Sequence, residues 1–178
     1  MVKQELLFCV LVTTMKKFTL AIIALFISVG CFAQDIPFPF QGGKDAMTGF
    51  FKDSLVVSQD IIQKKATGAV IFKFSADAKG NIQKTIVYYA DDAVLVTPVI
   101  EALKKSNHKW VIPNHEKLHD FIIPFYIRYN LPETPDAALK KAAFDNYRNK
   151  RPILPGNQIP LDLATLLPAI TINYDVAP

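Results

Sequence analysis

The chain has 178 residues, of which 51% are hydrophobic and 20% are charged. This size allows one ordinary domain with an extension, and the composition excludes both a disordered chain and a membrane protein with many spans. The formal charge is +4; residues 1–33 carry +2 of it and the rest of the chain carries the other +2. A charge this small, with no cluster of lysines and arginines interleaved with aromatic residues, indicates no nucleic-acid partner.

The N-terminal segment is typical of a secretory signal peptide. From Met15 the sequence reads MKKFTLAIIALFISVGCFAQ, with two lysines, an apolar run over residues 18–29 and then small residues. The run is shorter than the roughly 20 residues that a transmembrane helix requires. Cleavage after Ala33 fits a small-residue site, and lipidation at Cys31 stays open as an alternative. We therefore expect a periplasmic or secreted protein.

Residues 1–14 are interpreted as an upstream extension from a mis-assigned start codon, with a longer leader as the alternative. Both cysteines, Cys9 and Cys31, lie within residues 1–33. The body after the leader therefore has no disulfide framework, no thiolate nucleophile and no cysteine zinc site.

The body opens with a Pro- and Gly-rich loop and a predicted helix. Asp45 can cap a helix over residues 46–65, whose apolar positions follow roughly helical spacing. Residues 56–58, Val-Val-Ser, could break this helix in the middle.

Two alternating runs joined by a tight turn predict a β-hairpin. Apolar residues of 67–76 alternate with Lys73 and Ser75, which is the pattern of a half-buried strand. The following DAKGN segment supplies Asp, Gly and Asn in the order of a tight turn, and Gly80 can take a positive φ. Residues 82–90, IQKTIVYYA, follow as the partner strand.

A second helix is predicted over residues 97–107, with Thr97 as its cap and Pro98 in its first turn. The preceding pair of carboxylates, Asp91 and Asp92, is interpreted as a solvated turn at the helix entry, because no partnered base accompanies it. Trp110 follows the helix and is expected to seal one end of the core, with an exposed binding tryptophan as the alternative.

The third predicted strand covers residues 118–130, LHDFIIPFYIRYN. Pro124 lacks a backbone N–H, so we expect a free or broken strand edge at that point. In the tail, residues 136–149 predict a short helix, four prolines then divide an apolar segment, and AITINY near the end could form one more short strand.

The order helix, strand, strand, helix, strand predicts an α+β fold. We expect a two-layer sandwich, in which a small antiparallel sheet carries two helices on one face. The expected domains are residues 1–33 as leader, residues 34–130 as the α+β domain, and residues 131–178 as a helical and Pro-rich C-terminal extension.

Several landmarks occur together in the body: FQGGKDAM before the first helix, GAVIFKFSADAKGNI in the hairpin, LVTPVIEALKK in the second helix, KWVIP after it and FIIPFYI in the last strand. With these landmarks, residues 38–130 resemble the TonB C-terminal domain family, and the hairpin pattern is the most specific of them. The chain resembles a small exported member, without the lasting membrane anchor and proline-rich spacer of the energy transducers. The resemblance implies a periplasmic, non-enzymatic protein-binding module.

In the energy transducers of this family, the domain binds outer-membrane transporters by adding a strand of the partner to its sheet. The resemblance implies the last strand, residues 118–129, as the docking edge, and an envelope protein, for instance an outer-membrane transporter, as the partner. The expected partner-binding residues are the alternating side chains of that strand: Phe121, Ile123, Phe125, Ile127 and Tyr129. Two alternatives stay open: the AITINY segment closes the sheet edge, or it pairs two protomers in a homodimer.

The segment HEKLH has the form of a zincin motif, in which His115 and His119 would bind zinc and Glu116 would act as the base. Pro113 and Pro124 leave room for at most about two helical turns, and residues after His119 alternate as a strand. We therefore interpret the motif as a coincidence and expect no catalytic residue, no metal and no cofactor. A zinc hydrolase that uses these three residues is the enzymatic alternative.

Overall fold

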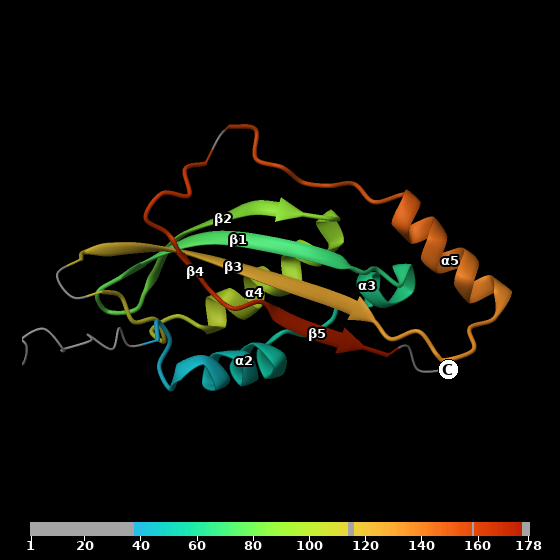
Figure 1. Cartoon of the computed structure of the whole chain (residues 1–178), viewed down its shortest axis with the longest axis horizontal. Helices are drawn as coiled ribbons and strands as arrows, with labels where there is room; N and C mark the ends of the chain where they lie inside the picture. Colours follow the sequence, from blue (N-terminus) through green and yellow to red (C-terminus); the bar gives the residue numbers. More distant parts are fainter. Residues whose placement is uncertain (1–37, 114–115, 158, 176–178) are drawn as a thin grey trace, which may run out of the picture. The chain divides into compact units, whose positions relative to one another are not determined.

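The computed structural model describes residues 38–113, 116–157 and 159–175 (Figure 1). Chain contacts divide the molecule into residues 1–36 and residues 37–178, and all described residues belong to the second unit. The predicted leader, its cleavage after Ala33 and the alternative lipidation at Cys31 lie outside the described residues. None of the helices in the described part has the length and hydropathy needed to cross a bilayer.

The fold is α+β, with one mixed sheet of five strands. The strands are β1 (Gly68–Asp77), β2 (Ile82–Ala90), β3 (Leu118–Tyr129), β4 (Thr165–Leu166) and β5 (Ile170–Tyr174). Strand β1 lies between β2 and β3 and is antiparallel to both, whereas β4 and β5 pair with β3 in parallel. The prediction of a purely antiparallel sheet is therefore wrong, because the C-terminal extension returns to the sheet by a long crossover, as parallel pairing requires.

The predicted hairpin is confirmed, and its turn shows why residue 80 is a glycine. The Asp77 carboxylate accepts hydrogen bonds from the backbone N–H groups of Lys79 and Asn81, each at 2.9 Å. Gly80 has a φ of 77°, and a Cβ at this position would lie 2.7 Å from the carbonyl oxygen of Trp110. Glycine is thus required both for its left-handed backbone and for the close approach of the neighbouring chain.

The first predicted helix is two helices, α2 (Gly43–Ser54) and α3 (Gln59–Lys64). The chain is extended at Ser58, whose hydroxyl caps α3 by accepting a hydrogen bond from the N–H of Ile61 at 3.4 Å. The interruption allows Leu55 and Ile61 to be buried in the same core.

The second predicted helix is α4 (Val96–Lys105), and it follows directly after a 3-10 turn, η1 (Ala93–Leu95). The prediction of Thr97 as its cap is wrong. Asp92 caps η1 instead, because its carboxylate accepts a hydrogen bond from the N–H of Val94 at 3.0 Å.

The core lies between the sheet and helices α2 and α4. Trp110 is 3% exposed, and its indole lies with ring centroids 4.5 Å from Phe74, 5.1 Å from Phe40 and 5.5 Å from Phe121. The indole N–H donates to the Ser106 hydroxyl at 3.0 Å, which satisfies its polar atom inside the core. The predicted core role of Trp110 is confirmed.

The C-terminal extension contains helix α5 (Ala137–Arg148), which buries none of its side chains. After α5, residues 150–157 and 159–164, here called the strap, run past the end of β2 and across the sheet to β4 (Figure 1). The strap first pairs with the end of β2 through an isolated bridge between Ala90 and Ile153. It then passes over Lys73 of β1, whose ammonium donates to the carbonyl of Pro160 at 2.5 Å.

Candidate functional site

The side chains predicted to bind a partner belong to the core. Phe121, Ile123, Phe125 and Ile127 are each 0% exposed, and Tyr129 is half-buried. The four fully buried side chains therefore face the core and not a partner, while binding of a partner along this strand stays a prediction. Their alternation marks the inward face of β3, since alternate residues of a strand point to the same side of the sheet.

The predicted docking edge of β3 is occupied by the chain's own C-terminal residues. Strand β5 pairs with β3 from Phe125↔Ile170 to Tyr129↔Tyr174, and β4 pairs with it at Phe121 and Ile122. The free edge that the sequence predicted is therefore closed in this structure. A gap in the pairing falls between Ile122 and Phe125, at the site of Pro124, so the predicted break in the edge is present.

Strand β5 completes the core as well as the sheet. Ile170, Ile172 and Tyr174 are at most 7% exposed, whereas Asn173 between them is exposed. The Tyr174 hydroxyl lies 2.8 Å from the carbonyl oxygen of Ala66 and 3.2 Å from that of Ile61. Burial raises the pKa of Tyr174 to about 12, so this hydroxyl stays a hydrogen-bond donor at physiological pH.

Two polar clusters fasten the strap to the sheet, and the first is centred on Asp91. Its carboxylate accepts hydrogen bonds from the Tyr89 hydroxyl at 2.5 Å, the Ala69 N–H at 2.8 Å and the Lys150 ammonium at 3.2 Å. Burial raises the pKa of Asp91, but these hydrogen bonds outweigh it and leave the pKa below its usual value. The prediction of a solvated turn is wrong for Asp91, because the strap covers it.

The second cluster lies under the strap at the middle of the sheet. Lys73 forms an ion pair with Asp120 at 2.8 Å, and the Ser75 hydroxyl donates to the same carboxylate at 2.5 Å. Lys73 and Ser75 point away from the core, as their alternation predicts, yet they are 9% and 8% exposed. Burial raises the pKa of Asp120, but hydrogen bonds from Lys73 and Ser75 outweigh it and lower the pKa below its usual value.

Replacing Asp120 with asparagine is expected to lower the free energy of unfolding by about 1–3 kcal/mol at pH 7, because the buried Lys73 ammonium loses its counter-ion. The folded pKa of Asp120 lies below the unfolded value of about 3.9. The contribution of the Asp120 carboxylate to the free energy of unfolding is therefore present above about pH 4, and it is lost as the pH falls through the folded pKa. Urea unfolding measured from pH 7 to pH 2.5 checks this. The difference in the free energy of unfolding between wild type and Asp120→Asn should disappear at low pH.

Asp162→Asn is the matched control, since Asp162 is an exposed carboxylate on the strap. It should change the unfolding free energy by no more than about 0.5 kcal/mol at any pH. A difference in the free energy of unfolding between wild type and Asp120→Asn that stays constant from pH 7 to pH 2.5 would contradict this role of the carboxylate.

The described part of the HEKLH motif is not helical. Lys117 lies in a bend, and Leu118 and His119 begin β3, while His115 lies outside the described residues. Both ring nitrogens of His119 have partners, Glu116 Oε2 at 2.7 Å and the Thr165 hydroxyl at 2.7 Å. Among the described residues no group of three potential metal ligands comes together. His119 therefore connects β3 to β4, a role for which the sequence carried no signal.

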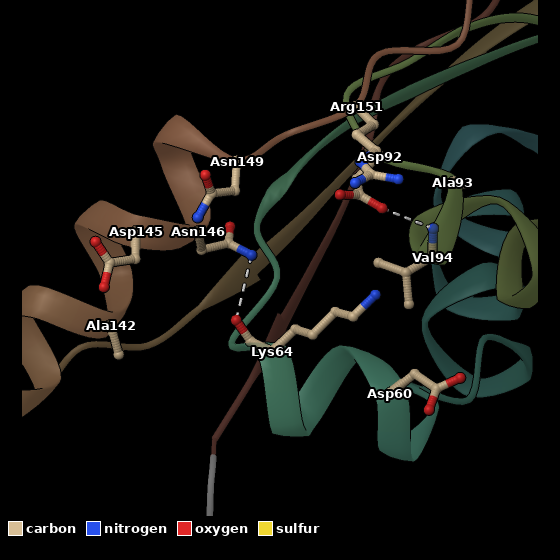
Figure 2. Close-up of a pocket in the computed structure, with 10 residues that line it drawn as sticks. All are labelled: Asp60, Lys64, Asp92, Ala93, Val94, Ala142, Asp145, Asn146, Asn149 and Arg151. Atoms are coloured by element: carbon tan, nitrogen blue, oxygen red, sulfur yellow. Dashed lines mark hydrogen bonds between the residues drawn. The ribbon is translucent and has the colours of Figure 1, made fainter.

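A polar cleft of about 830 Å³ lies where α5 faces α3 and η1 (Figure 2). Its lining carries both signs of charge, including Lys64, Asp92 and Arg151. Asn146 on α5 donates to the carbonyl of Lys64 at 3.2 Å across the cleft. No histidine, cysteine or serine is among the residues that line this cleft.

Comparison with protein-family models, curated proteins and solved structures found no match to this chain. The geometry itself defines an α+β domain in which the side of β3 that faces away from β1 accepts a parallel strand, and in which that strand is the chain's own β5.

Proposed function

We propose that this protein is a non-enzymatic binding module of the cell envelope that holds a protein partner by adding the partner's strand to β3. The single observation that supports it most is the pairing of β5 with β3, because this edge already accepts a separate strand in parallel. The signal-peptide-like leader and the resemblance to the TonB C-terminal domain family support an envelope location and an envelope partner, with an outer-membrane transporter as the candidate.

In this proposal β5 is a built-in occupant that the partner's strand replaces. The side chains of β5 then describe what a partner must supply: apolar residues at alternate positions and an aromatic residue two positions later, as in Ile170, Ile172 and Tyr174. Backbone hydrogen bonds give affinity in such complexes, and the pockets for alternate side chains give specificity.

In this proposal the segment that leads to β5 moves with it, and the contacts of Lys150 and Pro160 that fasten the strap have to break. Helix α5 buries no side chain, and the strap is mainly exposed, with Leu154 at 68% and Leu163 at 95% exposure. A partner competes with a tethered strand at an effective concentration in the millimolar range for a flexible linker. Binding therefore requires either a well-matched strand or a signal that releases the strap.

A second candidate function is self-association, in which β5 of one chain pairs with β3 of another. The observation that favours it is the same long, exposed connection, since domain swapping exchanges an element that a flexible segment tethers. Sizing chromatography separates the two candidates: an exchanged dimer has twice the mass of the closed monomer.

The test uses the full mature chain, its Ile172→Asp variant and a fluorescein-labelled peptide of residues 168–175, PAITINYD. The variant should release β5 and bind the peptide, and wild type should bind it at least about tenfold more weakly because its edge is filled. The peptide should also displace envelope proteins captured by the variant. Thr171→Asp, on the opposite face of β5, is the control and should behave like wild type. A folded Ile172→Asp variant that does not bind the peptide would contradict the proposal.

A further inference from the structure

Helix α5 turns one face toward α3 and leaves the opposite face uncovered. Ala142 and Asn146 lie on the inner face, where they line the cleft and are half-buried. Asn146 also donates to the carbonyl of Lys64 on α3, which fixes the orientation of the helix (Figure 2). Because residues three and four apart share a helix face, the positions between these form a second, outward face.

The outward face of α5, here called the outer face, consists of Lys140, Lys141, Phe144, Tyr147 and Arg148. Their spacing places them side by side along the helix. Phe144 is 59% exposed and Tyr147 is 71% exposed, which makes them the two most exposed aromatic side chains in the described part of the chain. The three cationic residues are exposed as well.

The charge of α5 is positive and mostly unneutralised. Lys140 and Arg148 form no ion pair within the described residues. Lys141 pairs at 2.9 Å with Asp145, which is the only acidic residue of the helix. The Arg148 guanidinium lies 5.8 Å from the centroid of the Phe144 ring, so a cation and an exposed ring stand next to each other on this face.

Exposed rings beside unpaired cations are the chemistry that binds an anionic phospholipid bilayer. Aromatic side chains enter the boundary between headgroups and acyl chains, while lysine and arginine pair with the phosphates. An acidic protein would also neutralise the cations, but it would need a groove shaped to the two rings of a helix that buries none of its own side chains. A lipid surface adapts to such a helix, so the combination of rings and cations favours a membrane.

We infer that the outer face of α5 is a docking surface for a membrane that contains anionic phospholipids, with the helix lying in the plane of the bilayer surface. Phe144 and Tyr147 insert, and Lys140, Lys141 and Arg148 contact the headgroups. This surface uses neither β3 nor β5, so the inference does not depend on strand exchange.

The test measures co-sedimentation of the full mature chain with vesicles of equal parts phosphatidylglycerol and phosphatidylcholine, and with vesicles of phosphatidylcholine alone. The chain should bind the anionic vesicles at least about tenfold more tightly, because each cation near an anionic surface contributes about fivefold. The double variant Lys140→Gln/Arg148→Gln should weaken this binding by at least about tenfold. Phe144→Ala, which leaves the charge unchanged, should weaken it by at least about threefold.

The double variant Lys44→Gln/Lys52→Gln is the matched control, because it removes two exposed lysines from α2 with the same change in net charge. Its binding to the anionic vesicles should stay within about twofold of wild type, since charges farther from the bilayer than about 10 Å are screened by salt. Equal loss of binding in the two double variants would show a response to net charge alone and would overturn the assignment to α5.

Phe144→Trp shows whether the ring enters the bilayer, since Trp110 is 3% exposed and lies in the core. The emission of this variant should shift to shorter wavelength on binding to the anionic vesicles, and phospholipids brominated in their acyl chains should quench it. Co-sedimentation without quenching, or equal binding to anionic and neutral vesicles, would overturn the inference. Failure to bind the anionic vesicles would overturn it in favour of an acidic protein as the occupant.

Discussion

Replacing Ile172 with aspartate is expected to destabilise the closed sheet by about 3 kcal/mol or more, because it places a charge in the core without a partner. Ile172 is 7% exposed and pairs with Ile127 in the middle of the β3–β5 ladder. The chain can relieve this cost by detaching β5 without unfolding β1 and β2. Amide exchange should therefore show loss of protection over β5, with protection in the β1–β2 hairpin retained.

Thr171→Asp is the matched control, because its side chain points away from the core at the neighbouring position and is only half-buried. It should change the free energy of unfolding by no more than about 1 kcal/mol, as is usual for surface substitutions. Equal loss of stability in both variants would show that the inward face of β5 has no special part in closing the sheet.

Replacing Phe74 with alanine is expected to lower the free energy of unfolding by about 3–5 kcal/mol, the usual cost of deleting a buried phenylalanine ring. Phe74 is 1% exposed, and its ring lies 4.5 Å from the ring of Trp110 and 5.3 Å from that of Phe121. Deletion leaves a cavity between β1, β3 and the indole. Urea denaturation monitored by tryptophan fluorescence measures both the stability and the packing around Trp110.

Phe144→Ala on α5 removes a ring of the same size that is 59% exposed. This control should change the unfolding free energy by no more than about 0.5 kcal/mol. A similar cost for the two substitutions would contradict the position of the core between the sheet and α2 and α4.

Local sequence patterns predicted most of the helices and strands, but not the cap before α4, where Thr97 was expected and Asp92 caps η1 instead. The second hairpin strand, residues 82–90, has the predicted bounds. A helix is present in the tail where one was predicted, and Asp136 caps it by accepting a hydrogen bond from the N–H of Leu139 at 2.6 Å. The signals there are alternation, turn residues and capping, which depend only on neighbouring residues.

Closure of the sheet by AITINY was one of two alternatives that the sequence left open, and the sequence could not decide between them, because the pairing joins residues far apart in the chain. The sequence indicated a short strand at AITINY, but its pattern does not specify which edge it joins or in which direction. The burial of Lys73 could not be predicted for the same reason. The alternation of the strand correctly placed Lys73 on the outer face of the sheet, but its burial depends on the strap and on Pro160, which is far away in the sequence. The pairing of Lys73 with Asp120 follows only once β1 and β3 are known to be neighbours.

The burial of Phe121, Ile123, Phe125 and Ile127 has a different explanation. A strand-adding edge presents its backbone to the partner, and its inward side chains belong to the core whether or not a partner is bound. Alternation identifies which face of a strand is buried, but it does not identify which strand is at the edge. The docking edge proposed at β3 is therefore defined by strand order, which the sequence alone did not contain.

We propose that β5 is an exchangeable strand, and native-state hydrogen exchange of the wild-type chain can decide whether it is. The amides of β5 (Ile170–Tyr174) should open together with a free energy clearly below that of global unfolding, while the amides of β1 exchange only through global unfolding. If β5 and β1 instead open with the same free energy and the same dependence on denaturant, β5 is a permanent part of the fold and the claim is contradicted.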